Sequence, residues 1–209
     1  MNQTISYYDE HAEEFCKTTI DADMSLCRDK FLDYIERSAS ISTIENGSSS
    51  KLHILDAGCG SGRDAKAFIE AGYQVTAIDA SAKVCEEAEK LLGQKVLCMS
   101  FEYIDFKEEF HGIWACASLL HISRENIDDV LKRLWLALKD EGILYASFKY
   151  GEGERITNGK FFNDYQEDSL TELMIRNHFH IEELFLTQDV RQGREQEQWI
   201  NVLAKKPYS

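Results

Sequence analysis

Lys51-Leu-His-Ile-Leu-Asp-Ala-Gly-Cys-Gly-Ser-Gly-Arg63 is the stretch of this chain that decides its fold. Leu52, Ile54 and Leu55 form the short apolar run of a buried parallel strand. The glycines that follow let the chain reverse with positive φ angles and leave no Cβ in the way of a ligand. The stretch therefore predicts a strand and a tight turn whose backbone can touch what binds there.

The residues after the turn extend it into a strand-helix-strand unit. Residues 63–71 mix apolar and polar positions as expected of a helix packed on a sheet, with its N-terminal amides facing the turn, and Gly72 ends it. Residues 75–79 read as a second strand that ends at Asp79. This acid stands 21 positions after Gly58, close to the roughly 20-residue offset of a ribose-binding acid. The unit therefore predicts nucleotide binding, with the Asp79 carboxylate accepting both ribose hydroxyls.

Strands and helices continue to alternate from residue 52 to residue 148, which is typical of a doubly wound parallel sheet with right-handed crossovers. The C-terminal part adds two further strands joined by a polar loop. After the first two strands, further strands are expected at residues 96–99, 143–148, 179–186 and 198–204, and residues 112–122 are expected to form a strand with its exit loop. Helices are expected at residues 124–139 and 167–177.

The spacing of Gly58, Gly60 and Gly62, preceded by Asp56, resembles the first motif of class I S-adenosylmethionine-dependent methyltransferases, written D/E-x-G-x-G-x-G. A dinucleotide fingerprint needs a third glycine where this chain has Arg63, so a nicotinamide oxidoreductase is disfavoured. The resemblance is closest to the tellurite-resistance-type methyltransferases in the tyrosine-rich start, the glycine loop at residues 57–64 and residues 119–122. Three segments resemble the small-molecule members of the family in general. They are the tyrosine-rich start, the pair Leu120-His121 and the sequence Leu138-Lys-Asp-Glu-Gly-Ile-Leu144.

The resemblance implies an α/β fold: a doubly wound, three-layer Rossmann-like sandwich. Its sheet has seven strands, mostly parallel with an antiparallel last strand, and an N-terminal helical cap. The whole chain, 1–209, is expected to be one class I methyltransferase domain, with a helical cap or lid at 1–45 and the Rossmann-like core at 51–206. Residues 38–50, rich in Ser and Thr, are expected to be the irregular link between them.

The implied cofactor is S-adenosyl-L-methionine, and the resemblance assigns a set of residues to it. The cofactor-binding candidates are Tyr8, Asp56, Gly58, Cys59, Gly60, Arg63, Asp79, Ala80, Ser100, Phe101, Glu102 and Ala117. Tyr8, Ala12 and Phe15 share one helical face, so the N-terminal segment is interpreted either as a lid over the cofactor or as a helix docked on the core.

The catalytic candidate is His121, because its ordinary pKa near 6.5 suits proton acceptance at neutral pH. The alternative, a histidine that only holds the loop backbone, stays open. The substrate-binding candidates are Lys149, Tyr150, Arg155 and Phe161. Lys149 and Arg155 are expected to hold an anionic group of the substrate, and Phe161 is expected to contact its apolar part. The segment that carries them, from residue 149 on, is expected to be a flexible polar loop.

Composition restricts the partners. The formal net charge of −14 argues against a nucleic-acid substrate. Six cysteines without a C-x-x-C pair argue against a zinc site and a disulfide framework, and no metal is predicted. No apolar run approaches the roughly 20 residues of a membrane span, and no secretory signal is recognised at the start, so a cytoplasmic protein is expected. The sequence leaves the oligomeric state open.

The predicted function is methyl transfer from S-adenosylmethionine to a small soluble acceptor by direct in-line displacement, which needs no covalent enzyme intermediate. The alternative is a non-catalytic cofactor-binding sensor or assembly partner that shares the fold. The sequence does not identify the acceptor atom.

Overall fold

The computed structural model of this chain describes residues 2–46 and 51–208. Its main element is a seven-stranded sheet in the order β3-β2-β1-β4-β5-β9-β8. The strands are β1 (His53–Ala57), β2 (Gln74–Asp79), β3 (Leu97–Cys98), β4 (Phe110–Ala115), β5 (Leu138–Lys149), β8 (His180–Gln188) and β9 (Gln198–Lys205). The pairs from β3 to β5 are parallel, whereas β9 is antiparallel to both β5 and β8. The predicted fold, with its antiparallel last strand, is confirmed.

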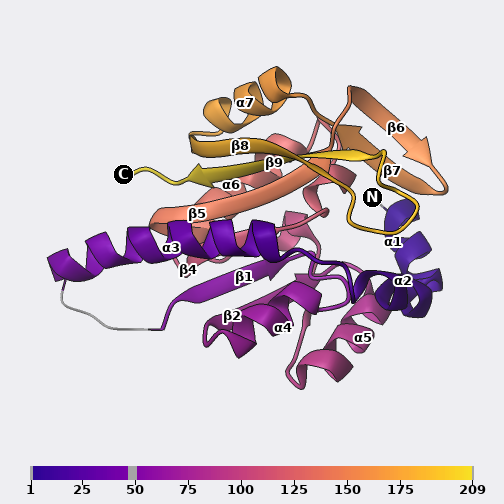
Figure 1. Cartoon of the computed structure of the whole chain (residues 1–209), viewed down its shortest axis with the longest axis horizontal. Coiled ribbons are helices and arrows are strands. Elements are labelled where there is room, and N and C mark those ends of the chain that lie inside the picture. The colour runs from indigo at the N-terminus through magenta and orange to yellow at the C-terminus, as the bar shows by residue number, and fades with distance from the viewer. Residues whose placement is uncertain (1, 47–50, 209) are drawn as a thin grey trace.

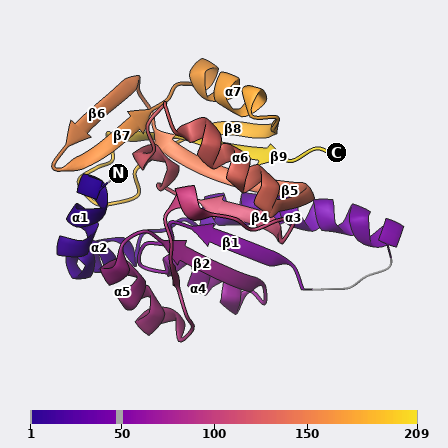
Figure 2. The same ribbon diagram turned by 180° about the vertical axis from the view of Figure 1, so that it is seen from behind.

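Helices cover both faces of the sheet and complete the three layers (Figures 1 and 2). On one face, α3 (Ser25–Asn46), α4 (Arg63–Glu70) and α5 (Ala82–Leu92) contribute to an aromatic-rich core cluster with β1 and β4. On the other face, α6 (Ile127–Ala137) and α7 (Glu167–Arg176) bury their apolar sides in a second cluster. Apolar burial on both faces explains why the central strands read as continuous hydrophobic runs.

Two short N-terminal helices, α1 (Asn2–Glu10) and α2 (Ala12–Thr19), lie at the carboxyl ends of the parallel strands. Figure 1 shows them beyond the arrowhead of β1, beside the hairpin β6 (Gly153–Thr157) and β7 (Lys160–Asp164). Ligands of open α/β sheets bind at this edge. Among the described residues, no helix is both long and apolar enough to cross a membrane.

The hairpin corrects the prediction of a flexible polar loop after residue 149. Its strands are antiparallel, and Thr157 pairs with Lys160 across a two-residue connection. Asn158 and Gly159 both have positive φ, 51° and 75°, as a type I′ turn requires. The Asn-Gly pair is a strong hairpin signal in sequence, and it was overlooked because the flanking residues are charged and glycine-rich.

The link predicted at residues 38–50 is also wrong over its first part. Residues 38–46 continue α3, and residues 47–50 lie outside the described residues. Ser and Thr have a helix propensity only modestly below that of alanine, and no Gly or Pro stands between Ser25 and Asn46 to stop the helix. Helix α6 is shorter than the helix predicted at residues 124–139. It ends at Ala137 because the twelve-residue strand β5 begins at Leu138.

Candidate functional site

A cavity of about 1140 Å³ opens at the carboxyl edge of the sheet. Its walls come from the glycine turn, the ends of β2, β4 and β5, the helices α1 and α2, the hairpin and the loop between β8 and β9. Of the residues predicted from the sequence, Glu102 and Phe161 are not part of its lining. The predicted residues that do line it are Tyr8, Asp56, Gly58, Cys59, Gly60, Arg63, Asp79, Ala80, Ser100, Phe101, Ala117, His121, Lys149, Tyr150 and Arg155.

The glycine turn is closely packed, most of all at Gly58. Gly58, Gly60 and Gly62 all have positive φ, at 81°, 54° and 80°. A Cβ on Gly58 would stand 2.4 Å from the Cβ of Ser118, and one on Gly60 would stand 3.3 Å from the ring of Phe15. The turn therefore needs glycine both for its conformation and for the approach of its neighbours.

Asp79 is held in place by the turn that it faces. Its Oδ2 accepts the N–H of Gly60 at 3.0 Å, and its Oδ1 accepts the N–H of Ser81 at 3.0 Å. Enclosure by the protein raises the pKa of this carboxyl, against the opposing effect of those amides. Because a carboxylate has about four acceptor positions, Asp79 keeps capacity for hydroxyl donors in the cavity.

Asp56 has a structural bond that the sequence did not reveal. The N-cap residue of α4 is Gly62, which has no side chain that could accept a hydrogen bond from the first turn. Asp56 takes this role, because its Oδ2 accepts a hydrogen bond from the N–H of Ala65 at 3.1 Å. Burial raises the pKa of Asp56 well above its usual range, and the nearby charge of Asp64 adds to this. The motif acid thus joins β1 to the start of α4.

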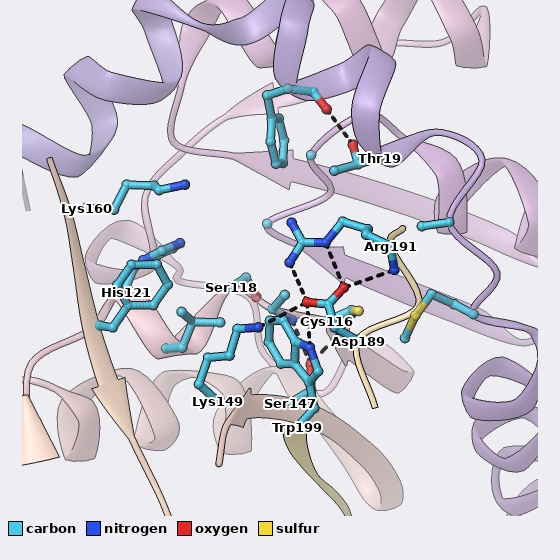
Figure 3. A pocket seen from close by; sticks show the side chains of 18 of the residues that line it. Thr19, Cys116, Ser118, His121, Ser147, Lys149, Lys160, Asp189, Arg191 and Trp199 are labelled. Carbon is cyan, nitrogen blue, oxygen red and sulfur yellow. Dashed lines mark hydrogen bonds and ion pairs between the residues drawn. The ribbon is translucent and has the colours of Figure 1, made fainter. Parts of the chain in front are cut away.

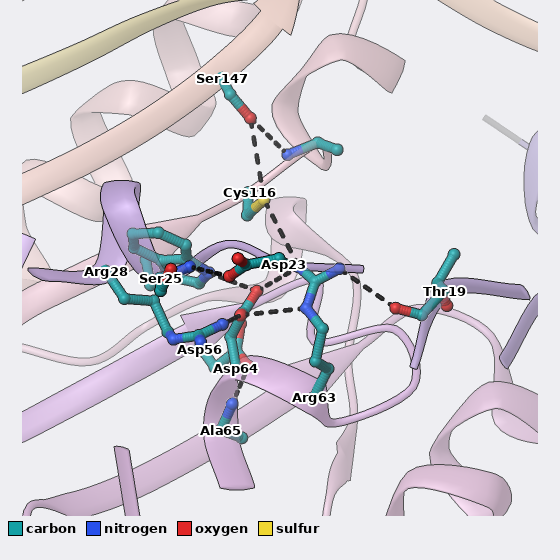
Figure 4. Close-up of polar contacts among 12 residues, drawn as sticks. Thr19, Asp23, Ser25, Arg28, Asp56, Arg63, Asp64, Ala65, Cys116 and Ser147 are labelled. Carbon is teal, nitrogen blue, oxygen red and sulfur yellow. Dashed lines mark hydrogen bonds and ion pairs between the residues drawn. The ribbon is translucent and has the colours of Figure 1, made fainter. Parts of the chain in front are cut away.

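Arg63 belongs to a buried network around Asp64 (Figure 4). The Asp64 carboxylate accepts hydrogen bonds from three side chains: Arg63 at 2.5 Å, Arg28 at 2.7 Å and the Trp114 indole at 3.0 Å. Burial opposes its ionisation, but the two guanidiniums outweigh burial and hold the pKa of Asp64 below its usual range. Arg63 also donates to the Thr19 carbonyl at 3.2 Å, so the network ties the turn to α2 and α3.

His121 is bonded on both ring nitrogens. Its Nδ1 lies 2.6 Å from the carbonyl oxygen of Phe161, and its Nε2 lies 2.9 Å from the hydroxyl of Tyr8. A carbonyl only accepts, so Nδ1 carries the hydrogen, and in the neutral ring Nε2 accepts from Tyr8. Burial lowers the pKa of His121 to about 4, so the ring is neutral at pH 7.

Helix α1 is fastened across the cavity at two further points. Thr4 Oγ1 accepts the N–H of Phe161 in β7 at 3.1 Å. On the opposite side, Asp9 accepts the hydroxyl of Ser81 at 2.6 Å and the N–H of Lys83 at 3.2 Å. The helix therefore spans from the hairpin to the start of α5, with Tyr8 on its cavity side.

The cations predicted to hold a substrate anion are paired within the protein. Lys149 bonds Asp189 at 3.0 Å and also Glu197, with its ammonium 4.0 Å from the centre of the Trp199 ring (Figure 3). Arg155 pairs with Asp164 at 2.5 Å. Both cations are therefore compensated by carboxylates of the protein itself, and their role as anion ligands stays a prediction. The loop that supplies Asp189 was expected only as a polar connection.

Ala117 is a strained position of the site. It has φ of 52° although it is not glycine, and its N–H donates to Ser147 Oγ at 2.8 Å. Strain of this kind persists where the surroundings hold the backbone in place.

Among the residues that the structure describes, no group of three or more His, Cys, Asp or Glu side chains is placed to hold a metal ion.

Comparison with known proteins agrees with this geometry. Residues 54–142 match the family model described as a methyltransferase domain. The chain is 29% identical over 136 residues to YqeM of Bacillus subtilis (strain 168), a protein named as a methyltransferase. That match covers 60% of this chain and 54% of the relative, so it spans about half of the relative's length.

Two solved structures share the whole fold. The 1,6-didemethyltoxoflavin-N1-methyltransferase of Burkholderia thailandensis, solved with its substrate and S-adenosylhomocysteine, has a TM-score of 0.73 at 19% identity, over 99% of this chain and 88% of that one. The cyclase SpnF has a TM-score of 0.68 at 16% identity, over 98% and 95%. The chain thus shares the fold of these solved structures, and its residues 54–142 match a methyltransferase domain. Its resemblance to the tellurite-resistance type stays a prediction.

Proposed function

We propose that this chain is an S-adenosylmethionine-dependent methyltransferase that acts on a small soluble acceptor. The observation that carries the proposal is the anchored carboxylate of Asp79 beside a glycine turn that has positive φ at its three glycines and no room for a Cβ at Gly58. Both features line one cavity at the edge of the sheet where ligands bind. SpnF, named as a cyclase, has the same fold, so the site rather than the fold has to support the reaction.

The residues present fit the cofactor. A cavity of about 1140 Å³ exceeds the roughly 300–1,000 Å³ of ordinary ligand pockets, which leaves room for a nucleoside and an acceptor together. Asp79 would accept the ribose hydroxyls, Gly58 and Gly60 would let the backbone approach, and Phe101 would cover the adenine. When bound, the cofactor supplies a methyl group activated by its sulfonium. Direct displacement then needs the acceptor in line with that methyl, at about 3 Å, and water kept away.

The protein can also receive a proton from the acceptor. His121 Nε2 is an available acceptor in the neutral ring, and the Tyr8 hydroxyl stands in front of it. A proton leaving the acceptor would move to the Tyr8 oxygen as the Tyr8 proton moves to Nε2. The carbonyl of Phe161 keeps the ring oriented throughout by accepting from Nδ1. The pair is thus positioned to accept a proton, with His121 acting through Tyr8, although burial makes the ring a weaker base than its ordinary pKa near 6.5 predicts.

Calorimetry tests the cofactor assignment. We expect S-adenosylhomocysteine to bind and NAD not to bind. Asp79→Asn should weaken binding at least tenfold, because hydrogen bonds to a charged group are worth about 1.5–3 kcal/mol. Asp105→Asn changes an exposed carboxylate outside the cavity lining and should leave the affinity as it is. Binding of NAD alone would overturn the proposal.

Transfer itself is tested with labelled S-adenosylmethionine and a panel of small metabolites. Label transferred to at least one compound, and lost in Asp79→Asn, supports the enzyme. Binding of the cofactor without transfer to any compound would instead support the sensor alternative.

A further inference from the structure

Most charged residues of the cavity lining are separated into two sides. The exceptions are Arg63 on the acidic side, and Asp189 and Glu197, which pair with cations of the basic side. Acidic residues gather around the glycine turn and the N-terminal helices, and basic residues gather on β5, the hairpin and the loop before β9. On the first side lie Asp23, Asp56, Asp64 and Asp79, and on the second Lys149, Arg155, Lys160, Arg191 and Arg194. The acidic side suits a cofactor that carries a sulfonium cation. In a chain with net charge −14, a basic wall in the same cavity stands out.

Nearly every cation of the basic side already has a carboxylate partner. Lys149 and Arg191 share Asp189, at 3.0 and 2.5 Å. Arg155 pairs with Asp164 at 2.5 Å, and Arg194 lies 3.8 Å from Glu197. Within residues 2–46 and 51–208, the exception is Lys160, for which no carboxylate oxygen lies within 4.0 Å and no hydrogen bond is formed by the ammonium.

The Lys160 ammonium is placed among aromatic rings instead. It lies 4.6 Å from the ring centre of Tyr7, 5.7 Å from that of Tyr8 and 6.0 Å from that of Phe162. Figure 3 shows its amine reaching into the pocket, on the same side as His121. Aromatic faces attract a cation but carry no net charge, so the positive charge stays uncompensated.

This arrangement is costly without an anion. Burial lowers the pKa of Lys160, and the positive charges of Arg194, Arg191 and Lys149 lower it further. The fully buried Lys206, by contrast, has the Leu138 carbonyl at 2.8 Å and Asp140 at 3.5 Å. A half-buried lysine without such partners is therefore the position of the cavity most favourable to a negatively charged ligand group.

We propose that Lys160 binds an anionic group of the methyl acceptor, a carboxylate or a phosphate. The inference rests on the proposed function and adds the class of substrate to it. Lys160 begins β7, and its ammonium lies 5.7 Å from the ring centre of Tyr8, the hydrogen-bond partner of His121. The anion would therefore bind beside the residues that receive the acceptor's proton.

The test uses inorganic phosphate and benzoate as probes, titrated by calorimetry into the full chain saturated with S-adenosylhomocysteine. We expect at least one probe to bind. Lys160→Gln should weaken that binding at least tenfold, and Lys160→Arg should stay within threefold because it retains the charge. Lys107→Gln, which changes an exposed lysine outside the lining, should have no effect. Affinity for S-adenosylhomocysteine should be the same in all variants.

Three results would overturn the inference. One is that neither probe binds, and another is equal probe affinity in the wild type and in Lys160→Gln. The third is weaker binding of S-adenosylhomocysteine to Lys160→Gln with unchanged binding of methylthioadenosine, since the lysine would then hold the cofactor's own carboxylate. If S-adenosylhomocysteine does not bind the wild type at all, the proposed function fails, and the same titration of the free protein still decides the role of Lys160.

Discussion

The hydroxyl of Tyr8 lies 2.9 Å from Nε2 of His121, although 113 positions separate the two residues in the chain. This bond joins α1 to the loop after β4 directly over the cavity. With the Thr4 and Asp9 contacts at either side, it holds the N-terminal helix across the site. The Phe161 carbonyl fixes the hydrogen on Nδ1, so the Tyr8 hydroxyl faces the nitrogen that is open to a proton, and the closure of the cavity and its proton chemistry share this contact.

Tyr8→Phe separates a lid from a docked helix. The substitution removes the hydroxyl and keeps the ring, so the closed position of α1 loses its bond to Nε2 of His121, at a cost of about 1–3 kcal/mol to closure. If α1 is a lid, calorimetry should show at least fivefold weaker binding of S-adenosylhomocysteine in a protein with a nearly unchanged melting temperature. Tyr103→Phe, at a position 70% exposed, is the control. A lower melting temperature with full affinity would show a docking helix instead.

His121 should make the folded protein sensitive to mild acid. Its pKa is about 4 in the folded state, where burial lowers it, and near 6.5 in an unfolded chain. Between these values the unfolded state binds more protons, so the contribution is fully present above pH 6.5 and is lost as the pH falls toward 4. The loss amounts to about 3 kcal/mol.

Urea unfolding of His121→Gln from pH 7 to pH 4 measures this effect, and the variant should lose less stability than the wild type. Some acid sensitivity should persist, because burial also lowers the pKa of His111 to about 4. His180→Gln, at an exposed position, should follow the wild type. Identical slopes for wild type and His121→Gln would contradict the buried neutral ring.

Gly58→Ala tests the packing of the turn. Its Cβ would meet Ser118 at 2.4 Å in a backbone with positive φ, whereas a Cβ on Gly93, also at positive φ, would meet open space. Gly93→Ala should therefore cost only the backbone strain of about 1 kcal/mol. Gly58→Ala should cost clearly more, in thermal unfolding, and should abolish measurable cofactor binding. Equal costs for the two variants would show that the turn adjusts freely.

Asp64→Ala should destabilise the fold strongly. Removing this carboxylate leaves Arg28, Arg63 and the Trp114 indole without their shared acceptor. Breaking a buried ion pair in this way typically costs about 3–5 kcal/mol. Asp128→Ala breaks the exposed pair with Arg176, for which at most about 1 kcal/mol is expected. Denaturant unfolding of both variants gives the comparison, and a similar small loss in both would contradict a stabilising network.

Local signals were sufficient for the sheet and for the cofactor side of the cavity. The glycine turn and Asp79 were predicted from spacing alone, because a strand that ends in a tight turn leaves its neighbours little freedom. The hairpin at Asn158-Gly159 could also be predicted from local sequence, because an Asn-Gly pair favours the type I′ turn that joins two antiparallel strands. The charged and glycine-rich residues before this pair are equally typical of a loop, so composition alone does not predict the hairpin.

The partners of charged side chains were beyond the sequence. Lys149 and Arg155 looked like free cations in a loop, yet the fold gives them Asp189 and Asp164 as partners. Lys160, which looked no different, is left among aromatic rings.

The sequence by itself determined the α/β architecture, the glycine turn and the position of Asp79, because backbone conformation and hydrophobic pattern are local properties of the chain. Only the tertiary structure decided that Tyr8 bonds His121 and which cations stay uncompensated. Such contacts join residues from distant segments, and their electrostatics depend on burial and on distances that no local pattern contains.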